Sequence, residues 1–224
     1  MYYIDLHTHR LTADSQVVAI LSSLVRSSAA DIPAAANLSY GIHPGQIEGD
    51  GEAQWELLRQ YARQSACVAI GEAGLDRLVG CPMERQIQLF TRQACLAEEL
   101  SKPLIIHCVR AWEELIACRK AIRPRQPWLI HGFRGKAPLA TQLLRQGFYL
   151  SLGHYFQPEA AQTAWPDRLF LETDEAVVSI QSVYERVAEA LAIDLRALCD
   201  QIQRNSVILR LKNTTFAAAI QSEF

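Results

Sequence analysis

Histidines and carboxylates follow several short apolar runs of this chain. The segment Asp5-Leu6-His7-Thr8-His9 follows the first run, and Glu72 follows a later one. Because His7 and His9 are two residues apart, an extended backbone would turn both imidazoles to one face, where they could bind one ion. Neutral imidazole and carboxylate are the usual ligands of zinc and related divalent ions. The candidate metal ligands are His7, His9, Glu72, His107, His131 and Asp174.

These candidate ligands indicate hydrolytic chemistry. Six ligands exceed what one tetrahedral ion needs and suit two divalent ions about 3.5–4 Å apart, with Glu72 able to bridge them. One ion would lower the pKa of a bound water, and both would stabilise charge in an in-line displacement. Asp174 can bind metal and accept the proton of the attacking water. We therefore predict a metal-dependent hydrolase with Asp174 and Glu72 as catalytic residues and two divalent cofactor ions. Zinc is expected, and magnesium, manganese or nickel suit the same ligand types.

Strands and helices must bring these residues together, because they are spread over the whole chain. Apolar runs without strict polar alternation predict strands buried on both faces, as in a parallel sheet. Amphipathic stretches with helical spacing lie between several of the runs. This alternation predicts an α/β fold, a TIM-like barrel, whose active site lies at the carboxyl ends of the strands. The expected strands are residues 2–4, 17–21, 38–42, 68–70, 104–106, 128–130, 149–152 and 169–171, and the expected helices are residues 54–66, 82–101, 111–122, 137–147 and 182–192.

The expected barrel is abridged near its N-terminus. Only residues 10–16 separate the first two expected strands, which is too few for a crossover helix. Residues 22–37 offer at most a short helix before the third strand. Because no linker or low-complexity segment interrupts the alternation, we predict a single domain over residues 1–224.

Composition and charge set further expectations. The net charge of -2 gives no long-range attraction to nucleic acid, so a polyanionic substrate would have to be held by local groups and bound metal. No apolar stretch reaches the length of a membrane span, and no secretory signal is visible at Met1. The six cysteines form no C-x-x-C pair and are expected to be reduced. These features predict a cytoplasmic protein without membrane contact. The sequence does not determine the oligomeric state, and a monomer is one possibility.

Six short motifs contain the candidate ligands. They are residues 5–9 (DLHTH), 41–44 (GIHP), 70–76 (IGEAGLD), 103–107 (PLIIH), 131–135 (HGFRG) and 171–174 (LETD). In this order they resemble the TatD family of metal-dependent hydrolases, deoxyribonuclease-like members of the amidohydrolase superfamily, and the resemblance extends from residue 2 to about residue 210. Glu72 is the most specific match, because related amidohydrolases often have a carboxylated lysine where this family has glutamate.

The resemblance implies a function and a set of site residues. The family cleaves phosphodiester bonds in DNA with bound metal, usually as an exonuclease, in a TIM-like barrel. The resemblance implies a metal site made of the six candidate ligands and a contact between His43 and the scissile phosphate. DNA or another phosphoester would be the substrate. Arg110 and Arg134 follow the ligand positions closely, where a guanidinium could hold phosphate oxygens through two parallel hydrogen bonds.

The chain departs from the family pattern where the substrate would be recognised. Family members usually have arginine two residues after the histidine at position 107, whereas this chain has Val109 there and Arg110 one position later. A proline commonly follows the motif that ends at Asp174, but here residues 175–177 are Glu-Ala-Val and the next expected helix begins soon after. These departures indicate a short subgroup that keeps the metal site and has trimmed substrate walls.

Two other functions are compatible with the same ligands. An amidohydrolase could cleave a carboxylic ester, lactone or amide with the same metals, and trimmed loops with an acidic net charge are compatible with it. A catalytically weak metal-binding partner protein would retain the ions for stability. A PHP-type phosphoesterase also opens with a D-x-H-x-H-like motif, but it would end with a D-x-H ligand pair that residues 173–176 do not supply.

Overall fold

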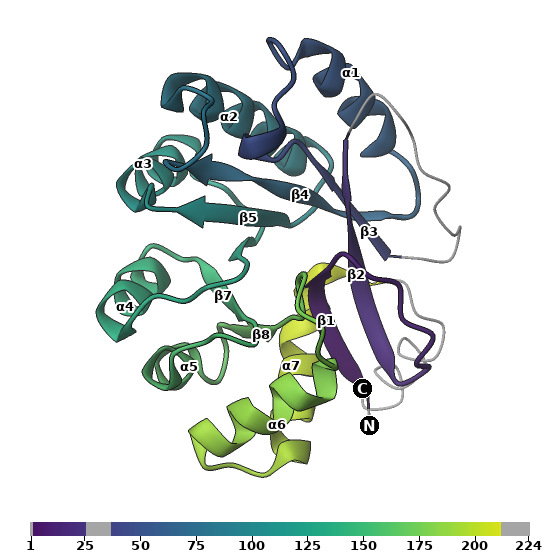
Figure 1. The fold of residues 1–224 in the computed structure, drawn as a ribbon, viewed down its shortest axis with the longest axis vertical. Coiled ribbons are helices and arrows are strands. Elements are labelled where there is room, and N and C mark those ends of the chain that lie inside the picture. The colour runs from purple at the N-terminus through teal and green to yellow at the C-terminus, as the bar shows by residue number, and fades with distance from the viewer. Residues whose placement is uncertain (1, 26–36, 212–224) are drawn as a thin grey trace.

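The computed structural model describes residues 2–25 and 37–211. Its strands form one parallel sheet in the order β1 to β8, with the helices on the outside (Figure 1). The strands are β1 Tyr3–Thr8, β2 Val17–Leu24, β3 Asn37–Gly41, β4 Cys67–Asp76, β5 Leu104–Val109, β6 Trp128–Ile130, β7 Tyr149–Leu152 and β8 Leu169–Leu171. The helices are α1 Glu52–Tyr61, α2 Met83–Glu99, α3 Trp112–Ile122, α4 Ala137–Arg145, α5 Pro158–Ala164, α6 Ile180–Leu191 and α7 Leu195–Ser206, with short 3₁₀ helices η1 Pro44–Gln46 and η2 Val207–Leu209.

Two hydrophobic clusters explain why the strands lack polar alternation. One cluster fills the space between the sheet and the surrounding helices. The other lies inside the barrel, so that the strands bury both faces. Every residue of β1, β3 and β4 is buried. The inner cluster consists of Leu6, Ile20, Val68, Ala69, Ile105, Leu129, Phe170 and Leu209.

The barrel is nearly closed between β1 and β8. Thr8, the last residue of β1, forms an isolated parallel bridge with Asp174, three residues after the end of β8. The backbone N–H of Asp174 donates to the carbonyl of His7 at 2.9 Å, and the N–H of His9 donates to the carbonyl of Asp174 at 3.3 Å. This bridge joins the carboxyl ends of the first and last strands, so ligand candidates 165 or more positions apart in the sequence are brought side by side.

A tyrosine completes the seam between β1 and β8 further down. The Tyr184 hydroxyl of α6 accepts from the N–H of Ile4 and donates to its carbonyl, both at 3.0 Å. Ile4 and Tyr184 are fully buried. Because a buried backbone group without a partner is costly, the hydroxyl takes the place of a neighbouring strand at this position.

Replacing Tyr184 with phenylalanine should destabilise the fold. The change leaves two buried backbone groups of Ile4 unpaired, which is expected to lower the free energy of unfolding by about 1–3 kcal/mol. For a chain of this size the melting temperature should fall by roughly 2–4 °C per kcal/mol. Thermal and urea unfolding of Y184F measure the effect. The control is Y61F, because the hydroxyl of Tyr61 makes no hydrogen bond within the described residues. Equal stability of Y184F and Y61F would contradict this account of the seam.

The predicted barrel and its abridged start are confirmed. Residues 9–16, between β1 and β2, contain no helix. The short helix considered within residues 22–37 falls mostly on residues 26–36, which lie outside the described residues, although β2 extends through Leu24. The prediction of one domain over residues 1–224 stays a prediction, because the described part ends at residue 211.

Several element bounds were predicted wrongly. Strands β1, β4 and β5 run past the apolar runs and include His7, Glu72 and His107 themselves. The strands continue because these polar side chains face one another within the barrel mouth instead of entering solvent. Helices α5 and α7 were not predicted, although α7 carries buried residues at Leu198, Cys199 and Ile202 with helical spacing.

No helix of the described residues is both long enough and apolar enough to span a membrane.

Candidate metal centre

Glu72 is the centre of the candidate site. Its side chain is buried, and its two oxygens face two groups of histidines. Oε2 lies 3.5 Å from Nε2 of His7 and 3.8 Å from Nε2 of His9. Oε1 lies 2.8 Å from Nε2 of His131 and 3.0 Å from Nδ1 of His107. One carboxylate therefore lies between two sets of candidate nitrogen ligands.

Asp174 completes the first set. Its Oδ1 lies 3.6 Å from Nε2 of His7 and 3.5 Å from Nε2 of His9. The strand bridge with Thr8 fixes the backbone of Asp174 beside these histidines. The six predicted ligands are thus brought together, from β1, β4, β5 and the ends of β6 and β8. Within the described part of the chain, three combinations of possible ligands have donor atoms within 4.8 Å of one another: His7, His131 and Asp174; His7, His9 and Glu72; and His43, Glu72 and His107.

The donor set fits a divalent cation. Both ring nitrogens of His7 are buried and have no hydrogen-bond partner among residues 2–25 and 37–211. Its Nε2 lies 3.5 and 3.6 Å from oxygens of Glu72 and Asp174, which is too far for a good hydrogen bond. Two ligands about 2.1 Å from one tetrahedral ion are separated by about 3.4 Å. The spacing of these atoms is therefore that of ligands around a common ion.

The electric field of the site favours positive charge. Burial disfavours a charged His131 imidazolium, yet the carboxylates of Glu72 and Glu172 raise the pKa of His131 well above its usual value. Burial also disfavours a charged Glu72, but the surrounding histidines, His131 foremost, lower the pKa of Glu72 well below its usual value. Ionised carboxylates buried among imidazoles are an environment that stabilises a bound cation.

Two carboxylates behind the ligands orient the imidazoles. Oδ2 of Asp76 lies 3.1 Å from Nε2 of His107, and Oε1 of Glu172 lies 3.3 Å from Nδ1 of His131. Glu172 also accepts the N–H of Gly132 at 2.6 Å. Such partners fix which ring nitrogen faces an ion. Asp76 and Glu172 both lie within the sequence motifs, but residue type alone could not distinguish a carboxylate that orients a histidine from one that binds the metal.

His43 is placed as a hydrogen-bond donor. Its Nδ1 accepts the N–H of Gly45 at 3.0 Å, so the proton of the neutral ring resides on Nε2. This Nε2 lies 3.4 Å from Oε1 of Glu72. Burial lowers the pKa of His43 to about 4, so the ring is neutral at pH 7. A neutral ring with a proton on Nε2 can donate to a substrate oxygen.

Two buried glutamines of α2 hold the backbone around the site. Gln93 accepts the N–H of Ile42 at 2.8 Å and donates to its carbonyl at 3.1 Å. Gln86 accepts the N–H of Asp76 at 2.7 Å and donates to its carbonyl at 2.9 Å. Being seven residues apart, they lie on one face of the helix. Each fixes the strand end beside a site residue, Ile42 being the neighbour of His43.

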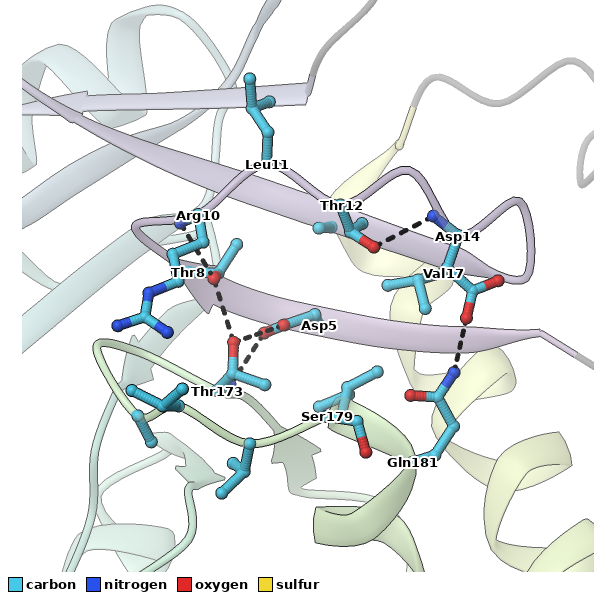
Figure 2. A pocket seen from close by; sticks show the side chains of 15 residues that line it. Asp5, Thr8, Arg10, Leu11, Thr12, Asp14, Val17, Thr173, Ser179 and Gln181 are labelled. Atoms are coloured by element: carbon cyan, nitrogen blue, oxygen red, sulfur yellow. Dashed lines mark hydrogen bonds between the residues drawn. The ribbon is translucent and has the colours of Figure 1, made fainter.

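A pocket of about 400 Å³ occupies the abridged start of the barrel, between the β1–β2 connection and the β8–α6 connection (Figure 2). At its floor Asp5 accepts the N–H and the hydroxyl of Thr173 at 3.0 and 2.7 Å. The hydroxyl oxygens of Thr173 and Thr8 lie 3.0 Å apart, so Thr173 can accept the hydrogen of Thr8 while it donates its own to Asp5. Across the rim, Gln181 donates to Asp14 at 2.7 Å. This network ties together the two connections that carry His9 and Asp174, and burial raises the pKa of Asp5 to about 7.

A second pocket, of about 240 Å³, lies beside Asp174 and is walled by the connections after β6, β7 and β8. Arg134 lines this pocket with its side chain exposed, so one predicted substrate residue lies next to a predicted ligand. Arg110 is also exposed, directly after β5 and with a left-handed backbone at φ 53°. Tyr155 and His154, which line the same pocket, were not predicted as substrate residues.

Comparison with known proteins assigns the family. The family model described as TatD related DNase matches residues 8–209. This chain belongs to that family. The human 3'-5' RNA nuclease TATDN2 is 33% identical over 149 residues, 61% of this chain and 19% of that protein. The 3'-5' ssDNA/RNA exonuclease TatD of Erwinia tasmaniensis is 35% identical over 146 residues, 60% of this chain and 56% of that protein.

The match therefore spans about half of the bacterial TatD nuclease and a smaller part of the human protein. The crystal structure of YJJV, a TatD homologue from Escherichia coli k12, superposes with a TM-score of 0.76 at 22% identity. It covers 92% of this TatD-family chain and 97% of its own. This likeness confirms the predicted barrel fold.

Proposed function

We propose that this TatD-family chain is a metal-dependent nuclease that hydrolyses phosphodiester bonds in DNA or RNA. The observation that carries the proposal is the position of Glu72, with Oε2 3.5 Å from His7 and Oε1 2.8 Å from His131. Its two oxygens thereby face two groups of candidate ligands, an arrangement that supports two ions held close together. The names of the human RNA nuclease and the bacterial ssDNA/RNA exonuclease support nucleic acid as the substrate class.

Two divalent ions are part of the proposal. His7, His9 and Asp174 with Oε2 of Glu72 would hold one, and a group around Oε1 of Glu72 would hold the other. Such ions lower the pKa of water and neutralise phosphate charge. Zinc is the expected metal because nitrogen ligands are numerous, and the same ligand types accept manganese, nickel and magnesium. The group around Oε1 of Glu72, which would hold the second ion, consists of His107 and His131.

The side chains of the chain itself perform the proton transfer and the positioning. The carboxylate of Asp174 accepts the proton of the attacking water. The Nε2–H of His43 donates a hydrogen bond to a non-bridging oxygen of the scissile phosphate. Arg134 and Arg110 hold phosphate oxygens, which supplies locally the positive charge that the net charge of -2 does not provide.

A carboxylic ester, lactone or amide hydrolase is the second candidate function. Only residues 172–179 connect β8 to α6, so the wall beside Asp174 is short and leaves room for a small carbon ester. The same ligands would polarise its carbonyl. A metal-binding protein with little catalysis is the third possibility.

One set of assays separates these functions. The purified chain is analysed for bound metal and then incubated with single-stranded DNA, single-stranded RNA, bis-p-nitrophenyl phosphate and p-nitrophenyl acetate. We expect two ions per chain and cleavage of the phosphodiesters. Hydrolysis of the acetate alone would favour the second function, and bound metal without any hydrolysis would favour the third. Less than one ion per chain would contradict the two-metal proposal.

Asp76 supplies a test that does not depend on activity. Replacing it with asparagine weakens the contact that orients His107, and loss of such a partner typically lowers metal affinity by about 10- to 100-fold. Titration of the metal-free protein against a competing chelator measures this affinity. The control is D167N, because Asp167 is exposed in the connection between α5 and β8. Equal affinities of D76N and D167N would contradict an orienting role for Asp76.

The cytoplasmic location stays a prediction. Fractionation of cells that express the native gene would test it.

A further inference from the structure

Tyr155 differs from the other aromatic side chains of the described residues because it faces solvent. It is 65% exposed and is the one aromatic residue among the exposed large hydrophobics of the described part. It lies in the connection after β7 and lines the pocket that also contains Asp174. An exposed aromatic ring beside a catalytic carboxylate offers a flat apolar surface at the position where a substrate must bind.

The segment that carries Tyr155 is held to the body of the barrel. Arg186 of α6 donates to the carbonyl of His154 at 2.6 Å and to its Nδ1 at 2.9 Å. The guanidinium of Arg186 also lies over the ring of Phe156, 5.6 Å from its centroid. Both neighbours of Tyr155 are thus fixed by one arginine. A surface that is already ordered loses less conformational entropy when a ligand binds.

Arg134 provides a cation next to the ring. Its guanidinium carbon lies 5.3 Å from the centroid of Tyr155. No salt bridge or side-chain hydrogen bond of Arg134 occurs within the described residues, so its planar donors are available to an anion. A guanidinium beside an aromatic ring can hold a phosphate while a base occupies the ring surface.

We propose that Tyr155 stacks against one nucleobase of a single-stranded substrate while Arg134 binds an adjacent phosphate. The inference rests on the proposed nuclease function and specifies its substrate. The bases of a duplex are already paired and stacked, so an exposed ring in a pocket can contact a base face only in an unpaired strand or end. Every base has such a face, so the contact favours single strands without selecting a sequence.

The test combines a variant with a change in the substrate. Y155A and the ring-retaining control Y155F are assayed on short single-stranded oligonucleotides in which nucleotides near the 3' end are made abasic one at a time. With all bases present, Y155A should lower kcat/KM roughly 5- to 150-fold, the range expected for loss of one base–aromatic stack, and Y155F should resemble the parent. At the position whose base contacts Tyr155, removing the base should reduce the Y155A effect to within about twofold.

Further measurements separate this inference from the proposed function. Metal content and thermal stability of Y155A should equal those of the parent, because the side chain is exposed. The control V207A changes an exposed apolar side chain of η2 that lines neither pocket, and it should behave as the parent. An equal Y155A effect on every abasic substrate, or no effect at all, would overturn the stacking contact while leaving the nuclease proposal intact.

If the parent cleaves no phosphodiester, the nuclease proposal fails first. Binding of the same oligonucleotides, followed by fluorescence anisotropy, then provides the comparison between Y155A and Y155F. Binding that does not depend on Tyr155, or an absence of binding, would overturn the inference.

Discussion

Glu72→Ala should remove most bound metal and lower phosphodiesterase activity by at least about 10³-fold, equivalent to about 4 kcal/mol of transition-state stabilisation. The reason is the central position of the carboxylate. Its oxygens lie 3.5 Å from a nitrogen of His7 and 2.8 Å from a nitrogen of His131, so its loss affects both ligand groups. Metal analysis of the dialysed variant and initial rates on single-stranded DNA measure the two effects.

The glutamine variant sharpens this prediction. Glutamine keeps one oxygen ligand and replaces the other with an NH₂ group that cannot bind a cation. Glu72→Gln should therefore retain about one ion per chain if the carboxylate bridges two. Glu189, exposed on α6, supplies the control E189A. A fully loaded and active E72A, with circular dichroism like that of the parent, would refute a bridging role.

The cluster of candidate ligands could be predicted from the sequence because the chemistry of histidine and carboxylate is visible in residue type. His7 and His9 at a spacing of two, and Glu72 after a buried run, are unusual for structural positions. The barrel followed from alternating apolar and amphipathic segments. Even so, the predicted strands ended too early. In a single sequence, a polar residue that faces the mouth of a barrel cannot be distinguished from the first residue of a loop.

The supporting contacts could not be found in this way. Gln93 and Ile42 are 51 positions apart, and Tyr184 and Ile4 are 180 apart. Nothing in a glutamine or tyrosine alone indicates which backbone groups it will satisfy. The same holds for the tautomer of His43, which depends on the N–H of Gly45 after the turn has formed. Such contacts depend on tertiary structure, whereas metal ligands are indicated by type and strand position.

The choice of substitution at Asp174 follows from its backbone. Asp174 has a φ of 54°, in the left-handed region, which asparagine adopts readily and alanine does not. Asparagine also keeps an oxygen near His7 and His9, whose Nε2 atoms lie 3.6 and 3.5 Å from Oδ1. Asp174→Asn therefore removes the basic carboxylate while preserving the strand bridge to Thr8 and most of the ligand geometry.

We expect D174N to lower kcat by about 10²- to 10⁴-fold, the usual contribution of a general base. KM should change little, because Asp174 is assigned to proton transfer and the substrate is held by other side chains. A loss confined to kcat identifies an interaction made in the transition state. Metal analysis separates loss of the general base from loss of the ions, because a variant without its ions would be inactive even if Asp174 were not the base. The control D200N changes an exposed carboxylate of α7 and should match the parent. If D174N keeps both its ions and its kcat, the proton must be accepted elsewhere, and the next candidate is Glu72, whose Oε2 lies 3.5 Å from Nε2 of His7.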